Sequence, residues 1–353
     1  MIRHRLIARW AIITGAILVA YAAGWFIAAS VLKAGIANWV DERRADGWIV
    51  EHGAITMDGF PLSWRASVEA PRLAQTKQNR TSRWSGPAIA LSWKPWSPRT
   101  VYYLTSGAHK FRLDTAILAG SPETTLEMVS GEGHLIFGPQ GRLSQLGVLL
   151  DGGRLSLPET PPLRFNRFQA VIDNDPSADG IKPAQAHLMP SFKLDSEIFG
   201  LTLPEDHRPP LGRTVGRIAL RGTIMGHIPP GHPSDTLPAW QKDGGTMEIS
   251  HLDLGWGPLK IYTTGTMALD SALQPTGALT GRVTGYGETL EALTTAGLIK
   301  PAVAQIGKFA LGAMARTPNG GGRPEIEVPV TLQDRWLYVG PIKLLQVPII
   351  RWD

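Results

Sequence analysis

The sequence predicts a mainly β protein: an N-terminal transmembrane helix followed by a large curved antiparallel sheet (a meander with a groove, or a sandwich) with a short helix pair near the C-terminus. Three observations predict this class. A charge-free apolar run fills residues 10–32. Short alternating segments follow it, separated by many of the 39 Gly and 28 Pro residues, while only 18% of residues are charged. Helical patterns of amphipathic character return only beyond residue 287.

The apolar run predicts a membrane anchor. At about 1.5 Å per residue it extends roughly 34 Å, enough to cross a hydrocarbon layer of about 30 Å. The basic flank before it consists of Arg3, His4, Arg5 and Arg9. Because such flanks stay cytoplasmic, we expect a single-pass protein of the bacterial inner membrane with its bulk in the periplasm. A cleavable signal peptide, with small residues at 28–30, and a buried core helix are the alternatives.

The helix is expected to continue beyond the anchor as a stalk. Ile36, Trp39 and Val40 share one face at helical spacing, and Gly47 is a natural C-terminal stop. A dimerising segment is the alternative to a stalk.

The predicted domain organisation is therefore an anchor over 1–32, a helical stalk over 33–47 and a β-rich periplasmic domain over 48–353. Proline-rich sequence near 195–212 marks a soft boundary between two halves of that domain.

Composition excludes several function classes. The chain has no cysteine, so disulfides, zinc–thiolate sites, iron–sulfur clusters and cysteine nucleophiles are excluded. The net charge is +5, and three of these charges lie in the basic flank of the anchor. The remainder is too small and too scattered for nucleic-acid binding.

Period-two alternation predicts the strands. It is clearest over 62–70, where apolar residues at even positions alternate with polar ones. The turn before this segment is Asp58-Gly59-Phe60-Pro61. Irregular, proline-rich segments are expected at 204–210 and 228–238. Strands are predicted at 48–57, 62–70, 88–93, 101–104, 110–113, 124–130, 134–137, 146–150, 154–157, 163–172, 182–194, 247–254, 259–269, 278–286, 326–332, 336–339 and 342–344.

Two helices are predicted near the C-terminus, at 288–296 and 301–316. We expect the pair to close one side or end of the sheet. Residues 333–335 are predicted to form a hairpin turn. The apolar stripe of the second helix comprises Val303, Ile306, Phe309, Ala310 and Ala313.

No pattern for catalysis, cofactor binding or metal binding rises above background, so we expect no such site and no enzyme. Gly285-Tyr286-Gly287 lacks the third glycine of a dinucleotide turn. Residues 173–179 carry three Asp but not the Gly and Glu of a calcium loop. His227 and His232 have no further ligand at suitable spacing.

One tryptophan cluster has two interpretations. Trp84, Trp93 and Trp96 lie among basic residues, namely Arg83, Lys94 and Arg99. Such a cluster suits contact with anionic lipid headgroups. Ordinary sheet packing with a proline-bent turn is the alternative.

Four motifs resemble one bacterial family in their order along the chain. They are Ala-Asp-Gly-Trp at 45–48, Asp-Gly-Phe-Pro-Leu at 58–62, Leu-Thr-Gly-Arg-Val at 279–283, and the closing segment 332–341. On these motifs the chain resembles domain-of-unknown-function family 2125, whose members look like single-anchor envelope proteins. Arg335 stands where that family commonly has Gly. The sheet around 254–258 is distantly similar to AsmA-like envelope proteins, which implies a curved sheet with an apolar groove linked to lipid transport or envelope homeostasis.

An anchored sheet with few charges and few helices has more apolar strand surface than those helices cover. We therefore expect an apolar sheet groove that binds a lipid-like ligand or docks an envelope protein partner, in maintenance of the cell envelope. A scaffold protein with a sheet packed on itself is the first alternative. An envelope hydrolase, which needs converging carboxylates or a Ser/His/acid set, is the second.

Overall fold

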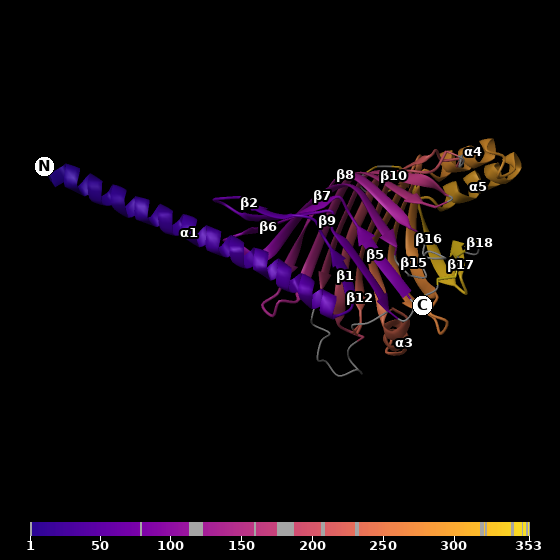
Figure 1. Ribbon diagram of the computed structural model, residues 1–353. Coiled ribbons are helices and arrows are strands. Elements are labelled where there is room, and N and C mark those ends of the chain that lie inside the picture. The colour runs from indigo at the N-terminus through magenta and orange to yellow at the C-terminus, as the bar shows by residue number, and fades with distance from the viewer. Residues whose placement is uncertain are drawn as a thin grey trace.

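The computed structural model describes residues 2–77, 80–112, 123–158, 160–174, 187–205, 209–229, 233–317, 321, 323–339, 342–347, 349–350 and 352. Within these residues the protein is mainly β, as predicted: one long N-terminal helix, one antiparallel sheet of 18 strands and a few short helices. Figure 1 shows the long helix projecting from one side of the sheet, with the last two helices at the opposite side.

The elements have the following bounds. The helices are α1 (Ile2–Ala45), α3 (Pro233–Lys242), α4 (Tyr286–Thr295) and α5 (Pro301–Met314). The first nine strands are β1 (Trp48–Glu51), β2 (Ile55–Asp58), β3 (Trp64–Glu69), β4 (Arg72–Lys77), β5 (Arg80–Ser85), β6 (Ala88–Lys94), β7 (Ser97–Arg112), β8 (Thr124–Phe137) and β9 (Leu143–Leu157). The remaining strands are β10 (Thr160–Asn174), β11 (Pro190–Thr202), β12 (Thr214–Met225), β13 (Thr246–Trp256), β14 (Leu259–Leu269), β15 (Pro275–Thr284), β16 (Glu325–Gln333), β17 (Trp336–Val339) and β18 (Ile342–Gln346).

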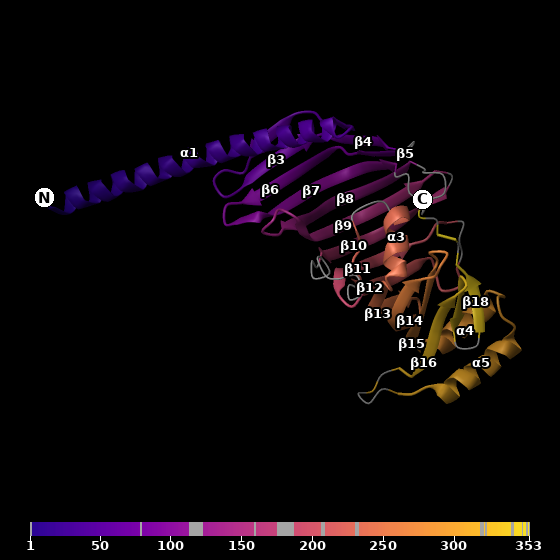
Figure 2. The same cartoon turned by 90° about the horizontal axis from the view of Figure 1, so that it is seen from below.

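From β7 onward each strand pairs antiparallel with the next, through to β18. The N-terminal strands branch from β7, which pairs with β6 over most of its length and with β5 near its end. One branch continues from β6 to β3 and β2, and the other from β5 to β4 and β1. Figure 2 shows the strands arranged along an arc, with α1 at one end.

Strand register gives the sheet one apolar face and one polar face. Because side chains alternate along each strand, residues paired across the sheet share a face. The polar face carries Arg65, Ser92, Tyr102, His134, Asp195 and Arg221. The apolar face carries Ala66, Leu91, Tyr103, Val148, Ala170, Ile198, Leu254 and Val283. Most of these apolar side chains are only half-buried, so this face is not enclosed like a globular core.

α1 is long and apolar enough to cross a membrane, by length and composition. It continues through the predicted stalk and ends where Gly47 takes a positive φ of 84°. Residues 9–20 are exposed on all sides, but from residue 22 onward a stripe at helical spacing is buried against the first strands. Val40 is 4% exposed in this stripe. The second half of the helix is thus part of the folded body.

Several strand predictions were wrong in their boundaries. The segment 48–57 forms two strands, β1 and β2, rather than one. Residues 101–112, 124–137 and 146–157 were each predicted to contain two short strands, but they lie in the single long strands β7, β8 and β9; residue 113 lies outside the described residues. Gly107 and Gly152 have positive φ and bend these strands without ending them. The strands β4, β5 and β12 were missed.

Two helix expectations also need correction. Residues 228–238 were predicted to be irregular, but α3 begins at Pro233 and its Trp240 indole donates to the Met225 carbonyl at 2.8 Å. The predicted pair α4 and α5 is present, yet the apolar stripe of α5 does not cover the sheet. Val303, Ile306 and Phe309 are 56%, 70% and 82% exposed.

The segment 195–212, where a soft boundary was expected, begins within β11, which ends at Thr202, and continues into the connection to β12, of which residues 206–208 lie outside the described residues. These two strands pair with each other along most of their length, so hydrogen bonding is continuous at this point of the sheet.

Candidate functional site

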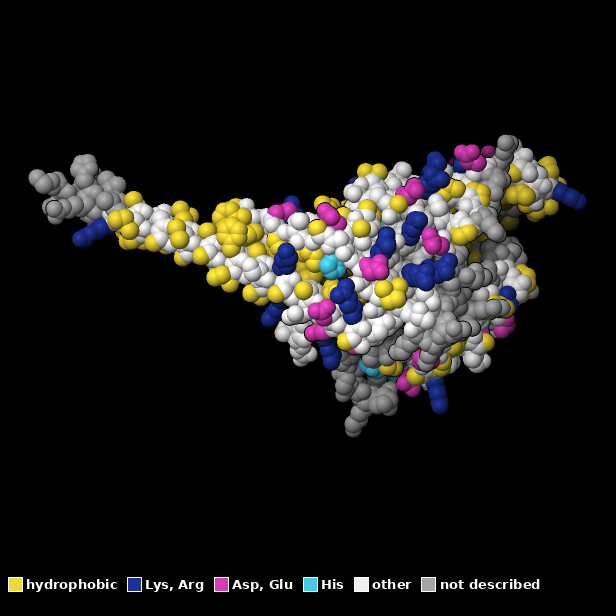
Figure 3. All heavy atoms as spheres, in the orientation of Figure 1, with side chains coloured by type: hydrophobic (Ala, Val, Ile, Leu, Met, Phe, Trp, Pro, Cys, Tyr) yellow, Lys and Arg dark blue, Asp and Glu magenta, His cyan; other side chains and the backbone are white. Residues whose placement is uncertain are grey.

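An apolar cavity of about 580 Å³ lies where the second half of α1 packs against the first strands of the sheet. Its volume falls within the range of ligand pockets, about 300–1,000 Å³. In Figure 3 hydrophobic side chains fill the recess beside α1, with charged side chains around it. The cavity is lined by Val31, Leu32, Gly35, Ile36, Trp39, Val40, Val50, Glu51, His52, Ile55, Val68, Pro71, Arg72, Leu73, Trp84, Ile89, Leu91 and Trp93.

The helix supplies one wall because its lining residues recur every three to four positions from Val31 to Val40. Gly35 leaves space in this wall, since a Cβ placed there would meet nothing within 4 Å. The facing wall is the apolar side of the sheet, where Val68 pairs with Ile89. Both walls follow from the periodicity of side-chain direction, which is 3.6 residues in the helix and two residues in the strands.

Three polar residues, Glu51, His52 and Arg72, also line the cavity. Arg72 Nη1 lies 3.6 Å from Glu51 Oε2 in an exposed ion pair. His52 Nδ1 lies 2.8 Å from the Gly53 carbonyl oxygen. The cavity therefore combines an apolar lining with one exposed polar group of residues, which is the pattern expected for an amphipathic ligand.

The tryptophan cluster is divided between the two faces and the edge of the sheet. Trp84 and Trp93 line the cavity, so sheet packing accounts for both. Trp96 is 65% exposed in the turn between β6 and β7. Lys94 Nζ lies 4.8 Å from the centre of the Tyr102 ring, a cation–π contact on the polar face. Headgroup contact by Trp96 stays a prediction.

His109, which sequence reasoning did not single out, is in contact with Trp84, one of the residues that line the cavity. Its ring is 3% exposed and stacks between Trp84 and Phe111, with centroid separations of 6.0 and 6.5 Å. Its Nε2 lies 2.9 Å from Thr105 Oγ1. Burial lowers the pKa of His109, and a hydrogen bond with the Ser106 backbone opposes this only in part. The neutral ring therefore suits the apolar environment behind the cavity.

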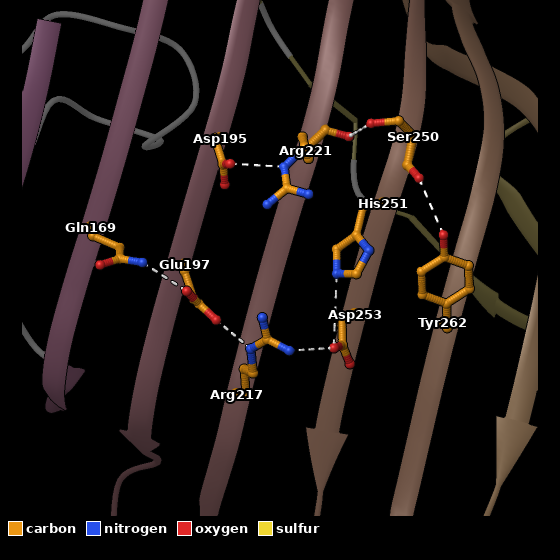
Figure 4. A network of polar contacts seen from close by, with 9 residues as sticks. All are labelled: Gln169, Asp195, Glu197, Arg217, Arg221, Ser250, His251, Asp253 and Tyr262. Atoms are coloured by element: carbon orange, nitrogen blue, oxygen red, sulfur yellow. Dashed lines mark hydrogen bonds and ion pairs between the residues drawn. The ribbon is translucent and has the colours of Figure 1, made fainter.

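The opposite face holds a polar hollow of about 730 Å³. Beside it a network of cross-strand contacts runs from β10 to β14 (Figure 4). Arg217 donates to Glu197, which raises the pKa of Arg217, and also to Asp253 at 2.7 Å. Arg221 donates to Asp195 at 2.8 Å. Each of these carboxylates is thus engaged by an arginine whose own side chain is partly exposed to solvent, as in a cross-strand series of ion pairs at a protein surface.

Ser250, His251 and Asp253 are the nearest approach to a hydrolytic set in this network. His251 Nε2 lies 3.9 Å from Asp253 Oδ2, beyond hydrogen-bond distance. Ser250 Oγ donates to the backbone carbonyl of Arg221 at 3.2 Å. The serine is therefore oriented toward the backbone and is not activated by the imidazole.

Within the part of the chain that the structure describes, the other motifs yield no assembled site. Gly285 has a φ of 73° at the start of α4, in a tight turn against the Pro258 carbonyl. Most of the Asp-rich loop at 173–179, and His232, lie outside the described residues. Among the residues that the structure describes, no group of three His, Asp or Glu lies close enough to hold a metal ion.

Comparison with curated proteins found no match, and comparison with solved structures found none either. A comparison with family models did find one, and the matched region begins within α1, at the half of the helix that packs on the sheet. Because this match covers residues 25–348, the chain belongs to the family described as uncharacterized protein conserved in bacteria (DUF2125).

Proposed function

We propose that the protein is a single-pass inner-membrane protein that binds an acyl chain, or a similar lipid-like chain, in the cavity between α1 and the first strands, and thereby serves envelope maintenance. The observation that carries the proposal is the position of this cavity. Its apolar end begins at Val31 and Leu32, the last residues of the apolar run that is long enough to cross a membrane.

The cavity suits a chain rather than a polar metabolite. Fifteen of its 18 lining residues are apolar or glycine, and the polar exceptions, Glu51, His52 and Arg72, lie close together. A chain buried along the tryptophan walls would remove apolar surface from water at about 25 cal/mol per Å². The polar residues of the lining would then face the polar head of the same molecule.

The rest of the apolar face supports a longer path for such a chain. Beyond the cavity, the apolar residues of successive strands continue in register from β7 to β16, and most of them are half-buried, although Ile326 and Val328 on β16 are buried. Leu254 and Ile261, far along this path, are paired neighbours. This surface is the groove of the proposal, and the cavity is its membrane-proximal end.

The basic flank at residues 3–9 supports an N-terminus in the cytoplasm and a sheet in the periplasm, because positively charged flanks favour the cytoplasmic side. The proposal includes no catalytic step, because arginines of the polar face engage the carboxylates of Glu197 and Asp195. The scaffold alternative, and the envelope protein partner expected from the sequence, stay open to the experiment below.

The test uses the full chain in nanodiscs that contain a phosphatidylethanolamine with a photoreactive diazirine on its acyl chain. After irradiation, adducts are mapped by peptide mass spectrometry. We expect adducts on β4 and β5, near Leu73 and Trp84, which lie beyond the apolar run of the helix. Gly35→Phe should fill the cavity and reduce these adducts at least several-fold.

Gly24→Phe is the matched control, because Gly24 also has open space around its Cβ position but does not line the cavity. It should leave the adducts on β4 and β5 unchanged. Adducts confined to α1 and to turns near it in the unaltered protein would overturn the proposal and favour the scaffold. Equal adducts in both variants would assign the labelling to another surface.

A further inference from the structure

The contact between α1 and the sheet begins within the apolar run of the helix, residues 10–32, and not after its end. Residues 10–20 have no side chain packed on the body, whereas Trp25 is 5% exposed and Ala29 is 5% exposed. Trp25 contacts the turn between β2 and β3, which comprises residues 59–63. The second half of the presumed membrane segment is therefore already in contact with the folded sheet.

Hydrogen bonds fix this joint. The Trp25 indole donates to the Ser63 carbonyl at 2.9 Å, and the Trp64 indole donates back to the Trp25 carbonyl at 3.2 Å. The Tyr21 hydroxyl donates to the Pro61 carbonyl. Three side-chain donors on two elements thus hold the helix and the turn in one relative position.

Aromatic rings fill the same joint. The Phe60 ring packs edge-on against Trp25, with centroids 5.5 Å apart, and stacks on Phe26 at 6.1 Å. The outer side of the turn is nevertheless uncovered, because Phe60 is 51% and Leu62 is 64% exposed. Residues 59–63 carry no charge, so the turn presents an apolar tip beside an apolar helix.

If α1 spans the bilayer, the length of its exposed part shows that this apolar tip cannot lie outside the bilayer. The free part, residues 10–20, reaches only about 16 Å at 1.5 Å per residue, roughly half of a hydrocarbon layer. The other half must be crossed by residues to which the turn is attached. Trp25 precedes Leu32 by seven residues, or about 10 Å along the helix axis.

Placing the membrane span nearer to the N-terminus would remove this overlap, but it would bring charged residues into the bilayer. A span that ended at Tyr21 would start near Ile2 and would bring Arg3, Arg5 and Arg9 into the layer. An arginine near the centre of a membrane helix is strongly unfavourable on insertion scales. A span over residues 10–32 avoids that cost.

We propose that the turn between β2 and β3 is inserted into the leaflet that faces the sheet, with Phe60, Pro61 and Leu62 among the acyl chains. The neighbouring turn between β6 and β7 lies at the same end of the sheet, because Trp64 pairs with Trp93. It carries the exposed Trp96 between Lys94 and Arg99, residue types that favour the headgroup level. The exposed ion pair of Asp58 with Arg65, 3.7 Å apart, marks the end of the apolar tip.

This inference rests on the membrane anchor of the proposed function but not on a ligand in the cavity. Its consequence is that the membrane-proximal end of the cavity lies at the bilayer surface, so a lipid reaches it without crossing water.

The test uses single cysteines, which the cysteine-free chain allows without prior substitutions. Full-length Leu62→Cys carrying a nitroxide is placed in nanodiscs, and its accessibility to oxygen and to a water-soluble nickel chelate is measured by power-saturation EPR. Ala20→Cys reports whether α1 is in the bilayer at all. Val129→Cys, at a site 75% exposed on β8, provides the aqueous reference.

We expect the Leu62 label to match the Ala20 label, with nickel accessibility several-fold below that of the Val129 label. A Leu62 label as accessible to nickel as Val129, beside a protected Ala20 label, would overturn the insertion while leaving the anchor intact. An Ala20 label open to nickel would reject the anchor and this inference together. Should Leu62→Cys fail to fold, Phe60→Cys gives the same reading.

Discussion

Trp25→Ala tests the joint between helix and sheet, and the size of its effect depends on where the joint lies. The substitution removes a side chain that is 5% exposed, its hydrogen bond to Ser63 and its contact with Phe60. In water, truncating a buried tryptophan costs about 3–5 kcal/mol. In a bilayer the transfer of apolar surface from water is absent, so only packing and the hydrogen bond are lost, about 1–2 kcal/mol.

We expect the smaller value, because the proposed insertion places the joint among lipids. A loss of about 1–2 kcal/mol lowers the ratio of docked to undocked helix roughly 5- to 30-fold. The assay is double electron–electron resonance between spin labels on Ala23→Cys and Thr56→Cys, in nanodiscs, over a urea titration. Trp25→Ala should broaden the distance distribution at lower urea than the unaltered protein.

Trp10→Ala is the matched control, since this tryptophan lies in the free part of the helix and is 64% exposed. An identical response of the two variants would show that Trp25 does not hold the joint. A loss of about 3–5 kcal/mol would show that the joint is hydrated and would contradict the insertion.

Three further outcomes follow from described contacts. The pKa of His109 is lowered in the fold, so its contribution to stability is complete above about pH 6.5 and is lost as the pH falls below that value. Urea titrations at several pH values should therefore show that the free energy of unfolding depends less on pH in His109→Asn than in the unaltered protein. Gly133→Ala should cost about 1–3 kcal/mol, because its Cβ would lie 2.0 Å from the Gly147 carbonyl oxygen, whereas Gly216→Ala, with 3.5 Å to its nearest neighbour, should be nearly neutral by the same titration. Arg335 has a φ of 65°, a backbone conformation that is strained for residues other than glycine. Arg335→Gly should therefore be more stable than Arg335→Val by about 1–2 kcal/mol, and equal urea midpoints of the two variants would contradict this strain.

The elements that the sequence could predict are those whose signal is local. The charge-free run of α1 needs no tertiary context, and the meander of β13, β14 and β15 alternates clearly between short turns. The closing hairpin was also predicted correctly. Its two-residue turn has positive φ at both Asp334 and Arg335, although the second position lacks the expected glycine.

The missed elements depend on partners far away in the chain. β4 and β5 are short and largely polar, and they are strands only because β1 and β7 pair with them. β12 does carry alternation, as at Ile218 and Leu220, but the proline-rich segments on both sides obscured it. Glycines were taken as strand ends, yet in β7 and β9 they bend a continuing strand.

The cavity could not be located from the sequence because its walls come together from separate elements between residues 31 and 93. The stripe of Ile36 and Val40 and the pair Trp84 and Trp93 were each visible as patterns. Which strand faces point toward the helix is decided by register across β3 and β6, and a one-residue slip would have reversed it. The sequence predicted that some apolar strand surface would stay uncovered, but it could not predict where in the fold this surface lies.

The same geometry bears on the choice between an anchor and a cleaved signal peptide. A cut after residue 30 would remove Trp25 and Ala29, both buried against the sheet, and would break the hydrogen bond to Ser63. A transient targeting segment has no reason to be a packed part of the mature fold, and the family match itself begins at residue 25. We therefore expect α1 to be retained, so that N-terminal peptides from residues 10–32 are recovered from the membrane-bound protein by mass spectrometry. Retention is also what the cavity requires, because the proposed membrane helix is the helix that forms the cavity wall.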